Sequence, residues 1–271
     1  MSPGAFGGQP PPNWYPDPQD PSRARYWDGI RWTEHTYPPR GAMAGPTYKS
    51  LGTLARTLIV LLAVTLVLGM IAVFSDWVEL DLLGRIVADP ESVSTAEADA
   101  SDQRQALIAL LEFLLWLGTV VVFLVWFRRA YRNLPALGAE SLRFSSGWAV
   151  GAWFVPFLNL VRPKQIMDDI WRASDPALPA QPSATGNQQP VPFLIVGWWA
   201  MFLVTNLLSW YAFTLTRNAV STEELRNASA VNFASDVLYL PLTVLVYLVI
   251  ARVTRRQEAR ANQLGASRAA W

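Results

Sequence analysis

The amino-acid sequence predicts an all-α integral membrane protein with four transmembrane helices and a small β-hairpin-containing module near the amino terminus. Four stretches of about 20 mostly apolar residues carry this prediction, because a helix of that length spans the roughly 30 Å hydrocarbon core of a bilayer. They are residues 54–74, 106–127, 193–215 and 233–251. The composition agrees, since 52% of the 271 residues are hydrophobic and only 16% are charged. Backbone in lipid must satisfy its own hydrogen bonds, so each stretch is expected to be helical.

Arginine and lysine collect on one side of the predicted membrane. Arg40 and Lys49 precede the first span, and two clusters of arginine follow the second and fourth spans. The clusters are Arg128, Arg129, Arg132 and Arg143, and Arg252, Arg255, Arg256 and Arg260. Segments rich in these residues stay in the cytoplasm. We therefore expect a multi-pass protein of the cytoplasmic membrane, with both termini inside the cell and a basic tail over residues 256–271.

The connections on the other side of the membrane carry a different balance of charge. Residues 76–104 contain eight acidic residues against two arginines, and residues 216–232 contain two of each sign. Because positive charge is scarce in residues 76–104, we expect this segment to be a loop outside the cytoplasm. With four spans and both termini inside, residues 216–232 also lie outside, and their balanced charge neither supports nor opposes this placement.

One apolar segment, residues 148–161, does not fit a count of four crossings. It would be about 21 Å long as a helix, which is too short to span a bilayer. Pro156 also interrupts its hydrogen-bond ladder. We expect a broken segment that is either re-entrant or buried against the helices.

An amphipathic helix is predicted over residues 163–174, followed by a flexible linker over residues 175–192. Its apolar face would hold Ile166, Met167, Ile170 and Trp171, and its polar face Lys164, Asp168, Asp169 and Arg172. Spacings of four residues predict ion pairs between Lys164 and Asp168 and between Asp168 and Arg172. We expect this helix to lie at the inner membrane surface. Together these elements form a multi-pass membrane domain over residues 51–255.

Residues 13–37 have the pattern of a small tryptophan-rich β module. Asp28-Gly29 separates two short aromatic-rich stretches, which is typical of a type I′ hairpin. The expected register pairs Trp27 with Ile30 and Arg25 with Trp32.

The residues on either side of the hairpin are predicted to form a third strand, a disordered segment and a linker. Trp14 and Tyr15 would supply a third strand. Residues 1–12, which are rich in Pro and Gly, are expected to be disordered, and residues 38–50 to be a linker.

The tryptophan-rich stretch resembles a known module. The residues that carry the resemblance are Trp14-Tyr15-Pro16-Asp17-Pro18, Arg25-Tyr26-Trp27-Asp28-Gly29 and Trp32-Thr33. They resemble the module catalogued as domain of unknown function two-five-one-zero, which is found mainly in actinobacteria.

The membrane domain is similar to a second family. The matching residues are Tyr131-Arg132-Asn133-Leu134, Gly147-Trp148, Trp153-Phe154-Val155-Pro156, Asn159-Leu160, Arg162-Pro163 and Ile170-Trp171-Arg172-Ala173. They resemble the multi-pass membrane family catalogued as domain of unknown function four-three-two-eight, and with the flanking spans the resemblance extends from about Leu54 onward. The two resemblances imply a bacterial cytoplasmic-membrane protein with a cytoplasmic accessory module, and they imply no particular activity.

The residue inventory gives little support to an enzyme, a cofactor site or a metal site. His35 is the only histidine, and the chain contains no cysteine. We therefore expect no metal site, no cofactor and no histidine or cysteine nucleophile within the membrane. A net charge of +1 gives no bulk attraction to nucleic acid.

Three polar residues near or within the membrane are candidates for a functional site, namely Glu112, Asn159 and Arg162. A carboxylate inside the bilayer is costly, so Glu112 either binds a proton or cation together with Asn159, Arg162 or Asn206, or hydrogen-bonds a neighbouring helix in a structural role. Asp236 has the same structural interpretation. Arg162 either binds an anionic group or reaches to lipid phosphates, with Asn159 capping the preceding segment.

The tryptophans have two interpretations as well. Trp14, Trp27 and Trp32 either form the core of the module or expose a face that binds a cytoplasmic partner, such as a proline-rich peptide. Within the membrane domain, six tryptophans are expected to form an aromatic belt at the interface. They are Trp77, Trp126, Trp148, Trp198, Trp199 and Trp210.

Three classes of function remain open after the sequence has been considered. The first is a membrane-embedded interaction or scaffold protein of the cell envelope, in which residues 13–37 dock a cytoplasmic protein. The second is a transporter or channel for a small ion or solute that uses Glu112, Asn159 and Arg162. The third is an enzyme that modifies lipid, which would need Lys164, Asp168 or Asp169 to converge on a cleft. The sequence favours the first class, and it does not indicate an oligomeric state.

Overall fold

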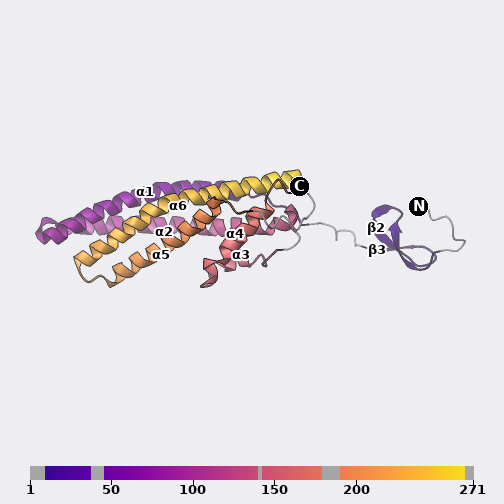
Figure 1. Cartoon of the computed structure of the whole chain (residues 1–271), viewed down its shortest axis with the longest axis horizontal. Helices are drawn as coiled ribbons and strands as arrows, with labels where there is room; N and C mark the ends of the chain where they lie inside the picture. Colours follow the sequence, from indigo (N-terminus) through magenta and orange to yellow (C-terminus); the bar gives the residue numbers. More distant parts are fainter. Residues whose placement is uncertain (1–9, 38–45, 140–141, 179–189, 266–271) are drawn as a thin grey trace. The chain divides into compact units, whose positions relative to one another are not determined.

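The computed structural model describes residues 10–37, 46–139, 142–178 and 190–265. The chain divides into two compact units, residues 1–47 and residues 48–271, which we call the module and the membrane unit. The module contains the strands, and the membrane unit contains the long helices (Figure 1). Most of the residues expected to be disordered or flexible lie outside the described residues.

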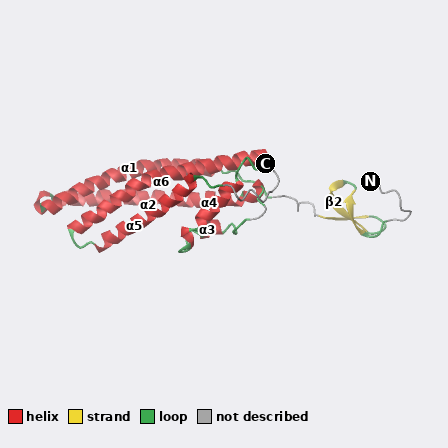
Figure 2. Ribbon diagram, viewed as in Figure 1, coloured by secondary structure: helices red, strands yellow, loops and turns green. Residues whose placement is uncertain are grey.

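Four long helices make up most of the membrane unit (Figure 2). They are α1 (Gly52–Ala88), α2 (Thr95–Arg132), α5 (Phe193–Asn218) and α6 (Thr222–Gln263). Each is long and apolar enough to cross a membrane, and each contains one of the four predicted spans. The four predicted helices are therefore confirmed.

Both expected external loops are much shorter than predicted, because the helices continue through them. α1 and α2 together occupy most of residues 76–104, which leaves only residues 89–94 as a connection that includes the short helix η1 (Pro90–Ser92). Residues 219–221 alone connect α5 to α6. Charged side chains can point to water from a helix and pair along it, so a change in charge does not mark the end of a helix.

Helix α6 packs along both α1 and α5, and α2 packs along α1. Gly69 of α1 is one reason that α1 and α6 approach closely. A Cβ atom at this position would lie 3.1 Å from the Leu240 side chain of α6. A small residue at such a crossing lets two helix backbones come together, which strengthens van der Waals contact between them.

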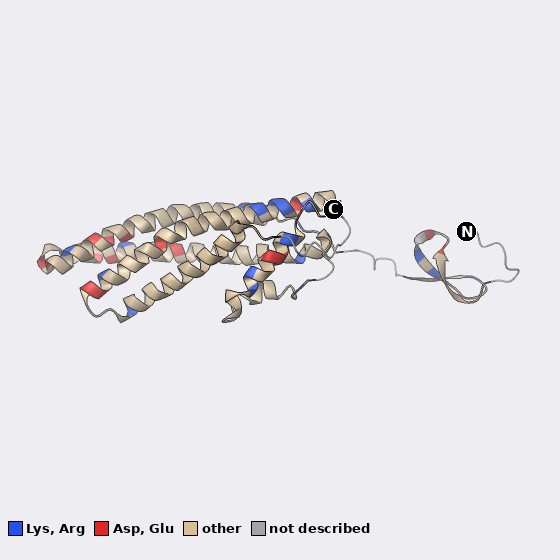
Figure 3. Ribbon diagram, in the orientation of Figure 1, with Lys and Arg blue, Asp and Glu red and all other residues tan. Residues whose placement is uncertain are grey.

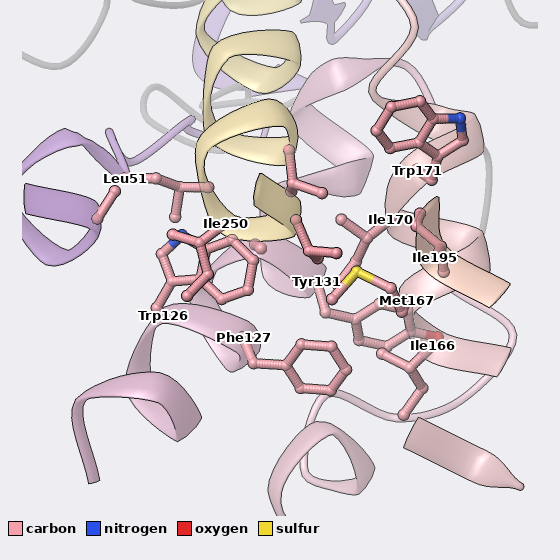
Figure 4. Packing of buried hydrophobic residues seen from close by; sticks show 14 of the residues in the cluster. Leu51, Trp126, Phe127, Tyr131, Ile166, Met167, Ile170, Trp171, Ile195 and Ile250 are labelled. Carbon is pink, nitrogen blue, oxygen red and sulfur yellow. The ribbon is translucent and has the colours of Figure 1, made fainter. Parts of the chain in front are cut away.

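The core of the membrane unit lies at the end of the bundle where α2 ends (Figure 4). Side chains from α2, α6 and the segment before α1 meet there with α4 (Arg162–Ala173). With contributions from α1, α5 and the turn after α2, the largest fully buried apolar side chains are Leu51, Leu58, Trp126, Phe127, Tyr131, Leu137, Ile166, Met167, Ile170, Ile195 and Ile250.

This core corrects two expectations from the sequence. The apolar face of α4 packs against the bundle instead of facing lipid, because Ile166, Met167 and Ile170 are fully buried. The tryptophan belt is wrong for Trp126, Trp198 and Trp199, which are at most 7% exposed, whereas Trp77 and Trp210 are exposed.

Polar side chains tie three chain segments together beside this core. The Nδ2 group of Asn133, just after α2, donates to the backbone oxygen of Lys49 at 2.8 Å and to Oε1 of Gln257 at 3.1 Å. Its Oδ1 accepts from the Lys49 backbone N–H at 3.0 Å, and Gln257 Nε2 donates to the Ala130 oxygen at 2.9 Å. Each side-chain oxygen and nitrogen of the two amides therefore makes a hydrogen bond, as polar groups buried in an apolar core require.

The same contacts correct the boundaries at both ends of the membrane unit. The expected linker over residues 38–50 ends before Tyr48, whose side chain is 2% exposed. The expected basic tail is helical up to Gln263, with Gln257 and Arg260 buried. Arg260 donates to the backbone oxygens of Leu137 and Leu178, so this arginine holds loops in place instead of facing solvent.

The broken apolar segment takes the irregular form that Pro156 predicts. It consists of α3 (Trp148–Gly151), a series of turns and the 3-10 helix η3 (Leu158–Leu160). Phe157 has a φ of +63°, a strained value for a residue with a side chain. Trp153 packs edge-on against Phe127 of α2 and Trp199 of α5, so one side of the segment is anchored on the helices.

The module is a three-stranded antiparallel sheet in the order β1-β2-β3. The strands are β1 (Asn13–Asp17), β2 (Asp20–Trp27) and β3 (Trp32–Tyr37). The predicted third strand from Trp14 and Tyr15 is confirmed.

The predicted hairpin register is wrong. Trp27 pairs with Trp32 and Arg25 with Thr36, and the Asp28 N–H donates to the Arg31 oxygen. The turn is therefore centred on Gly29-Ile30, one residue later than expected. Gly29 has a φ of +96°, which suits the first central position of a type II′ turn. The Asp28 carboxylate accepts the backbone N–H groups of Arg31 and Ile30, which hold its pKa below the usual value and fix the turn.

We expect the substitution Asn133→Ala to lower the free energy of unfolding by about 2–4 kcal/mol, because it leaves Gln257 and the Lys49 backbone unpaired in an apolar core. Thermal or denaturant unfolding in detergent measures this change. Asn206→Ala is the matched control, since this exposed amide bonds only to Phe202 of its own helix. Equal losses for the two variants would contradict the role assigned to Asn133.

Candidate functional site

A pocket of about 260 Å³ lies between the four long helices. Two of its lining residues are acidic, Glu112 from α2 and Asp236 from α6. The other lining residues are Thr65, Leu68, Phe113, Leu115, Trp116, Ser209 and Tyr239. The pocket thus combines two carboxyl groups and three hydroxyl groups with apolar walls, in helices whose outer surfaces are suited to lipid.

A third carboxyl group lies beside the pocket. Asp76 of α1 is 8% exposed, and its Oδ1 accepts from Gln105 Nε2 at 3.2 Å. Its Oδ2 is buried and receives no N–H or O–H donor. The charges of Asp76 and Glu112 both act on the carboxyl group of Asp236, so the three acidic side chains are neighbours.

Neighbouring polar groups position the acidic side chains. Asn232, one turn before Asp236 on α6, donates from Nδ2 to Asp236 Oδ2 at 3.3 Å. Ser235 of α6 and Ser209 of α5 share a hydrogen bond of 2.7 Å, which joins the two helices next to the pocket. Pro241 lies within α6 and removes one hydrogen bond from its ladder a little more than one turn after Asp236.

The sequence grouped Glu112 with the wrong partners. Asn159 and Arg162 do not line the pocket, and Asn206 bonds to its own helix. The residues that accompany Glu112 are Asp236 and Asp76, which the sequence placed at the ends of their spans. All three lie within about 10 Å of the same end of the predicted spans, given a rise of 1.5 Å per residue. The sequence signal that could have grouped these three residues is their similar depth, measured along each predicted span from its outer end.

Arg162 lies against two aromatic rings. Its guanidinium carbon lies 4.3 Å from the ring centroid of Trp148 and 4.8 Å from that of Phe144. Such contacts are favourable because the ring faces are electronegative. Asn159 lies within η3 and donates its backbone N–H to Val155. The contacts of Arg162 and Asn159 therefore stabilise the broken segment beside the start of α4.

The polar face of α4 contains an ion pair and a poorly satisfied carboxylate. Lys164 Nζ contacts both oxygens of Asp168, at 2.6 and 2.7 Å, which confirms the predicted pair. Asp169 Oδ2 is buried without a hydrogen-bond partner. Burial raises the pKa of Asp169, although the positive charges of Arg143 and Arg172 act in the opposite direction. Arg172 completes the four polar residues that the sequence placed on this face.

The three candidate tryptophans of the module do not share one face. Trp27 and Trp32 have ring centroids 5.2 Å apart, and Tyr15 joins them at 6.3 Å from Trp32. Trp14, the neighbour of Tyr15 in β1, points to the other side of the sheet, where it contacts Tyr26 at 5.4 Å. The predicted face of Trp14, Trp27 and Trp32 is therefore wrong, because adjacent strand residues point in opposite directions.

Charge is segregated along the membrane unit (Figure 3). Lysine and arginine positions cluster at the end of the bundle where α6 finishes, whereas acidic positions of α1 and α2 lie toward the opposite end. Among the described residues, no group of three or more His, Cys, Asp or Glu side chains has an arrangement that could hold a metal ion.

Four helices are long and apolar enough to cross a membrane, and two family models match the sequence. Residues 89–255 match the family described as Domain of unknown function (DUF4328), and residues 12–45 match the one described as Protein of unknown function (DUF2510). The first match covers more than half of the chain, so the protein belongs to the DUF4328 family and has an amino-terminal DUF2510 module. Both resemblances seen in the sequence are confirmed. No curated protein and no solved structure matches the chain.

We expect Asp169→Asn to stabilise the protein at pH 7 by about 1 kcal/mol, because a neutral group replaces an ionised carboxylate whose Oδ2 is buried without a hydrogen-bond donor. A raised folded-state pKa means that Asp169 stabilises the fold only at low pH, and this contribution is lost as the pH rises through the folded-state pKa. The melting temperature of Asp169→Asn should therefore depend less on pH than that of the unaltered protein. Asp168→Asn is the matched control and should be destabilising, since it removes both contacts of Lys164. A lower melting temperature for both variants at pH 7 would refute this interpretation of Asp169.

Proposed function

We propose that the membrane unit binds a proton or a small monovalent cation in the acidic pocket and transports it. The observation that supports this proposal is that Glu112 and Asp236 line one pocket between four apolar helices, with Asp76 beside them. A transporter was the second choice from the sequence, and the shared pocket raises it above a purely structural role for Glu112.

The physical argument rests on the cost of carboxylate charge away from water. A single carboxylate within a bilayer costs on the order of 2–3 kcal/mol, so such residues usually have a function. Carboxyl groups that lie close together cannot all ionise freely, because each charge opposes the next. A bound proton or monovalent cation removes this repulsion. The hydroxyl groups of Thr65, Ser209 and Tyr239 offer further oxygen ligands within the same pocket.

We propose that the pocket opens toward the outside of a bacterial cytoplasmic membrane and that both termini are cytoplasmic. The basic end of the bundle, near the carboxyl end of α6, supports this orientation through the preference of arginine-rich segments for the cytoplasm. Below the pocket, toward that basic end, Trp126 and Phe127 are fully buried. A site open to one side above a packed core corresponds to one state of an alternating-access cycle.

Glu112→Gln and Asp236→Asn should each reduce cation-dependent proton flux into proteoliposomes by about tenfold or more, because each removes an ionisable oxygen ligand from the pocket. A pH-sensitive dye trapped in the vesicles measures the flux after a step in pH, with Na⁺ or K⁺ as the only other cation. Glu223→Gln is the matched control, since Glu223 is exposed in the first turn of α6, outside the pocket. Flux that equals that of protein-free vesicles, or that is the same in all variants, would rule out the proposal.

A second candidate function is that of a membrane-embedded interaction protein of the cell envelope, in which the module docks a cytoplasmic protein. The observation that favours it is the separate compact module with apolar side chains exposed to solvent. Trp14 is 45% exposed, Tyr37 67% and Ile30 80%. Exposed aromatic side chains are common in recognition surfaces.

Deletion of residues 1–46 should remove specific proteins from the set that co-purifies with the membrane unit, while the membrane unit keeps its melting temperature. The deletion spares Tyr48, which is buried in the membrane unit and is needed for its core. Quantitative mass spectrometry of detergent-solubilised complexes measures the change. An unchanged set of co-purifying proteins would count against a recruiting role for the module.

A further inference from the structure

A short proline segment lies on one face of the module. Pro10, Pro11 and Pro12 precede β1, and two aromatic side chains of the sheet bond to their carbonyl groups. Tyr15 Oη donates to the Pro11 oxygen at 2.9 Å, and Trp27 Nε1 donates to the Pro10 oxygen at 3.0 Å. The sequence predicts disorder over residues 1–12, and the two hydrogen bonds correct this prediction for the proline segment.

Proline chemistry explains why the segment lies on the face of the sheet and does not extend it. Proline has no N–H group, so a run of three cannot donate to the ladder of a neighbouring strand. Its carbonyl groups are free acceptors, and consecutive prolines favour an extended helix without internal hydrogen bonds. Aromatic side chains that donate from an N–H or O–H group are well suited to such a segment, because they offer a flat apolar surface and a donor together.

The face that receives the prolines is made by Tyr15, Trp27 and Trp32. Gly29 in the hairpin turn helps the segment to approach, since a Cβ atom there would lie 3.2 Å from Cγ of Pro12. The opposite face, around Trp14 and Tyr26, has no contact of this kind among the hydrogen bonds of the described residues. The two faces of the sheet therefore differ in a way that the number of tryptophans does not reveal.

We propose that the face of Tyr15, Trp27 and Trp32 is a binding site for a proline-rich segment of a partner protein, and that Pro10–Pro12 is its resident intramolecular ligand. The proposal rests on the second candidate function and names the class of partner that the module recruits. The prolines are exposed on their outer side and are held here by two side-chain hydrogen bonds. A competing segment needs to replace only these contacts and the ring packing, so the resident prolines tune affinity by competition. Recognition of proline-rich segments by aromatic grooves is a general mode of peptide binding.

The test uses the full chain in detergent and a fluorescein-labelled peptide with the sequence of residues 8–13, Gly-Gln-Pro-Pro-Pro-Asn. A tethered ligand acts at an effective concentration in the millimolar range, so the unaltered protein should bind the free peptide weakly. Replacement of Pro10, Pro11 and Pro12 by Ser frees the face and should tighten peptide binding at least about tenfold, measured by fluorescence anisotropy.

Two further substitutions in the triple-serine background identify the face. Trp27→Phe removes the indole donor and should cancel most of the gain in affinity. Trp14→Phe is the matched control on the other face and should leave the affinity unchanged. Near-ultraviolet circular dichroism checks that the aromatic sheet stays folded, and Pro11→Ser alone, with an expected gain of about threefold, is the alternative if the triple variant unfolds.

The possible results separate this inference from the second candidate function. No gain in peptide affinity in a folded variant, or an equal loss for Trp14→Phe and Trp27→Phe, overturns the proline site. If the triple variant forms a dimer with the unaltered protein and does not bind the peptide, the proline proposal is also overturned. The aromatic face would then bind a second copy of the chain. If co-purifying proteins still depend on residues 1–46 when peptide binding fails, the module recruits partners by another surface and only the proline proposal falls.

Discussion

The cost of a polar group without a partner, away from water, is the constraint on which the rest of this structure depends. Apolar helices satisfy their backbone groups internally, and this leaves side chains as the only polar groups that need partners. The membrane unit meets this requirement in two different ways at its two ends. Neutral amides close one end of the bundle, and carboxyl groups gather near the other.

The two buried amides at one end of the bundle are paired, whereas the carboxyl groups near the other end are not. Asn133 and Gln257 bond to each other and to backbone groups of neighbouring segments, so this end is fixed by complementary donors and acceptors. At the acidic end, Oδ2 of Asp76 is buried without a donor, and Glu112 and Asp236 place two more carboxyl groups in the pocket. Paired amides thus lie at one end of the bundle and surplus carboxyl acceptors near the other, where a positive ligand would satisfy them. This contrast underlies the proposed binding of a proton or monovalent cation.

The module follows the same constraint on a smaller scale. Three strands bury too little apolar area to form a large core, so aromatic rings and prolines cover one another instead. The carbonyl groups of the prolines obtain donors from Tyr15 and Trp27. The same side chains therefore stabilise the sheet and have the chemistry of a recognition surface. Competition between the resident prolines and a free peptide is what distinguishes these two roles.

The sequence by itself determined which helices and strands form, and the tertiary structure decided which of them pack together. Apolar length predicted the four long helices, Pro156 predicted the broken segment, and the motif residues predicted both families. These are local properties, because the length of an apolar stretch and the geometry of proline do not depend on distant residues. The ends of the helices were missed because charged residues can continue a helix into water.

The grouping of residues required the structure, since it depends on the rotation and packing of whole helices. The amphipathic pattern of α4 is the same for a helix on lipid and a helix on protein, so only packing showed which surface Ile166 and Ile170 cover. Glu112 likewise had several candidate partners in the sequence, and the rotation of α2 and α6 selected Asp236. In the module, a shift of the turn by one residue brought Trp32 opposite Trp27. Hydropathy records how much apolar surface each segment has, whereas the packing of segments that are distant in sequence determines where that surface and its few polar groups lie.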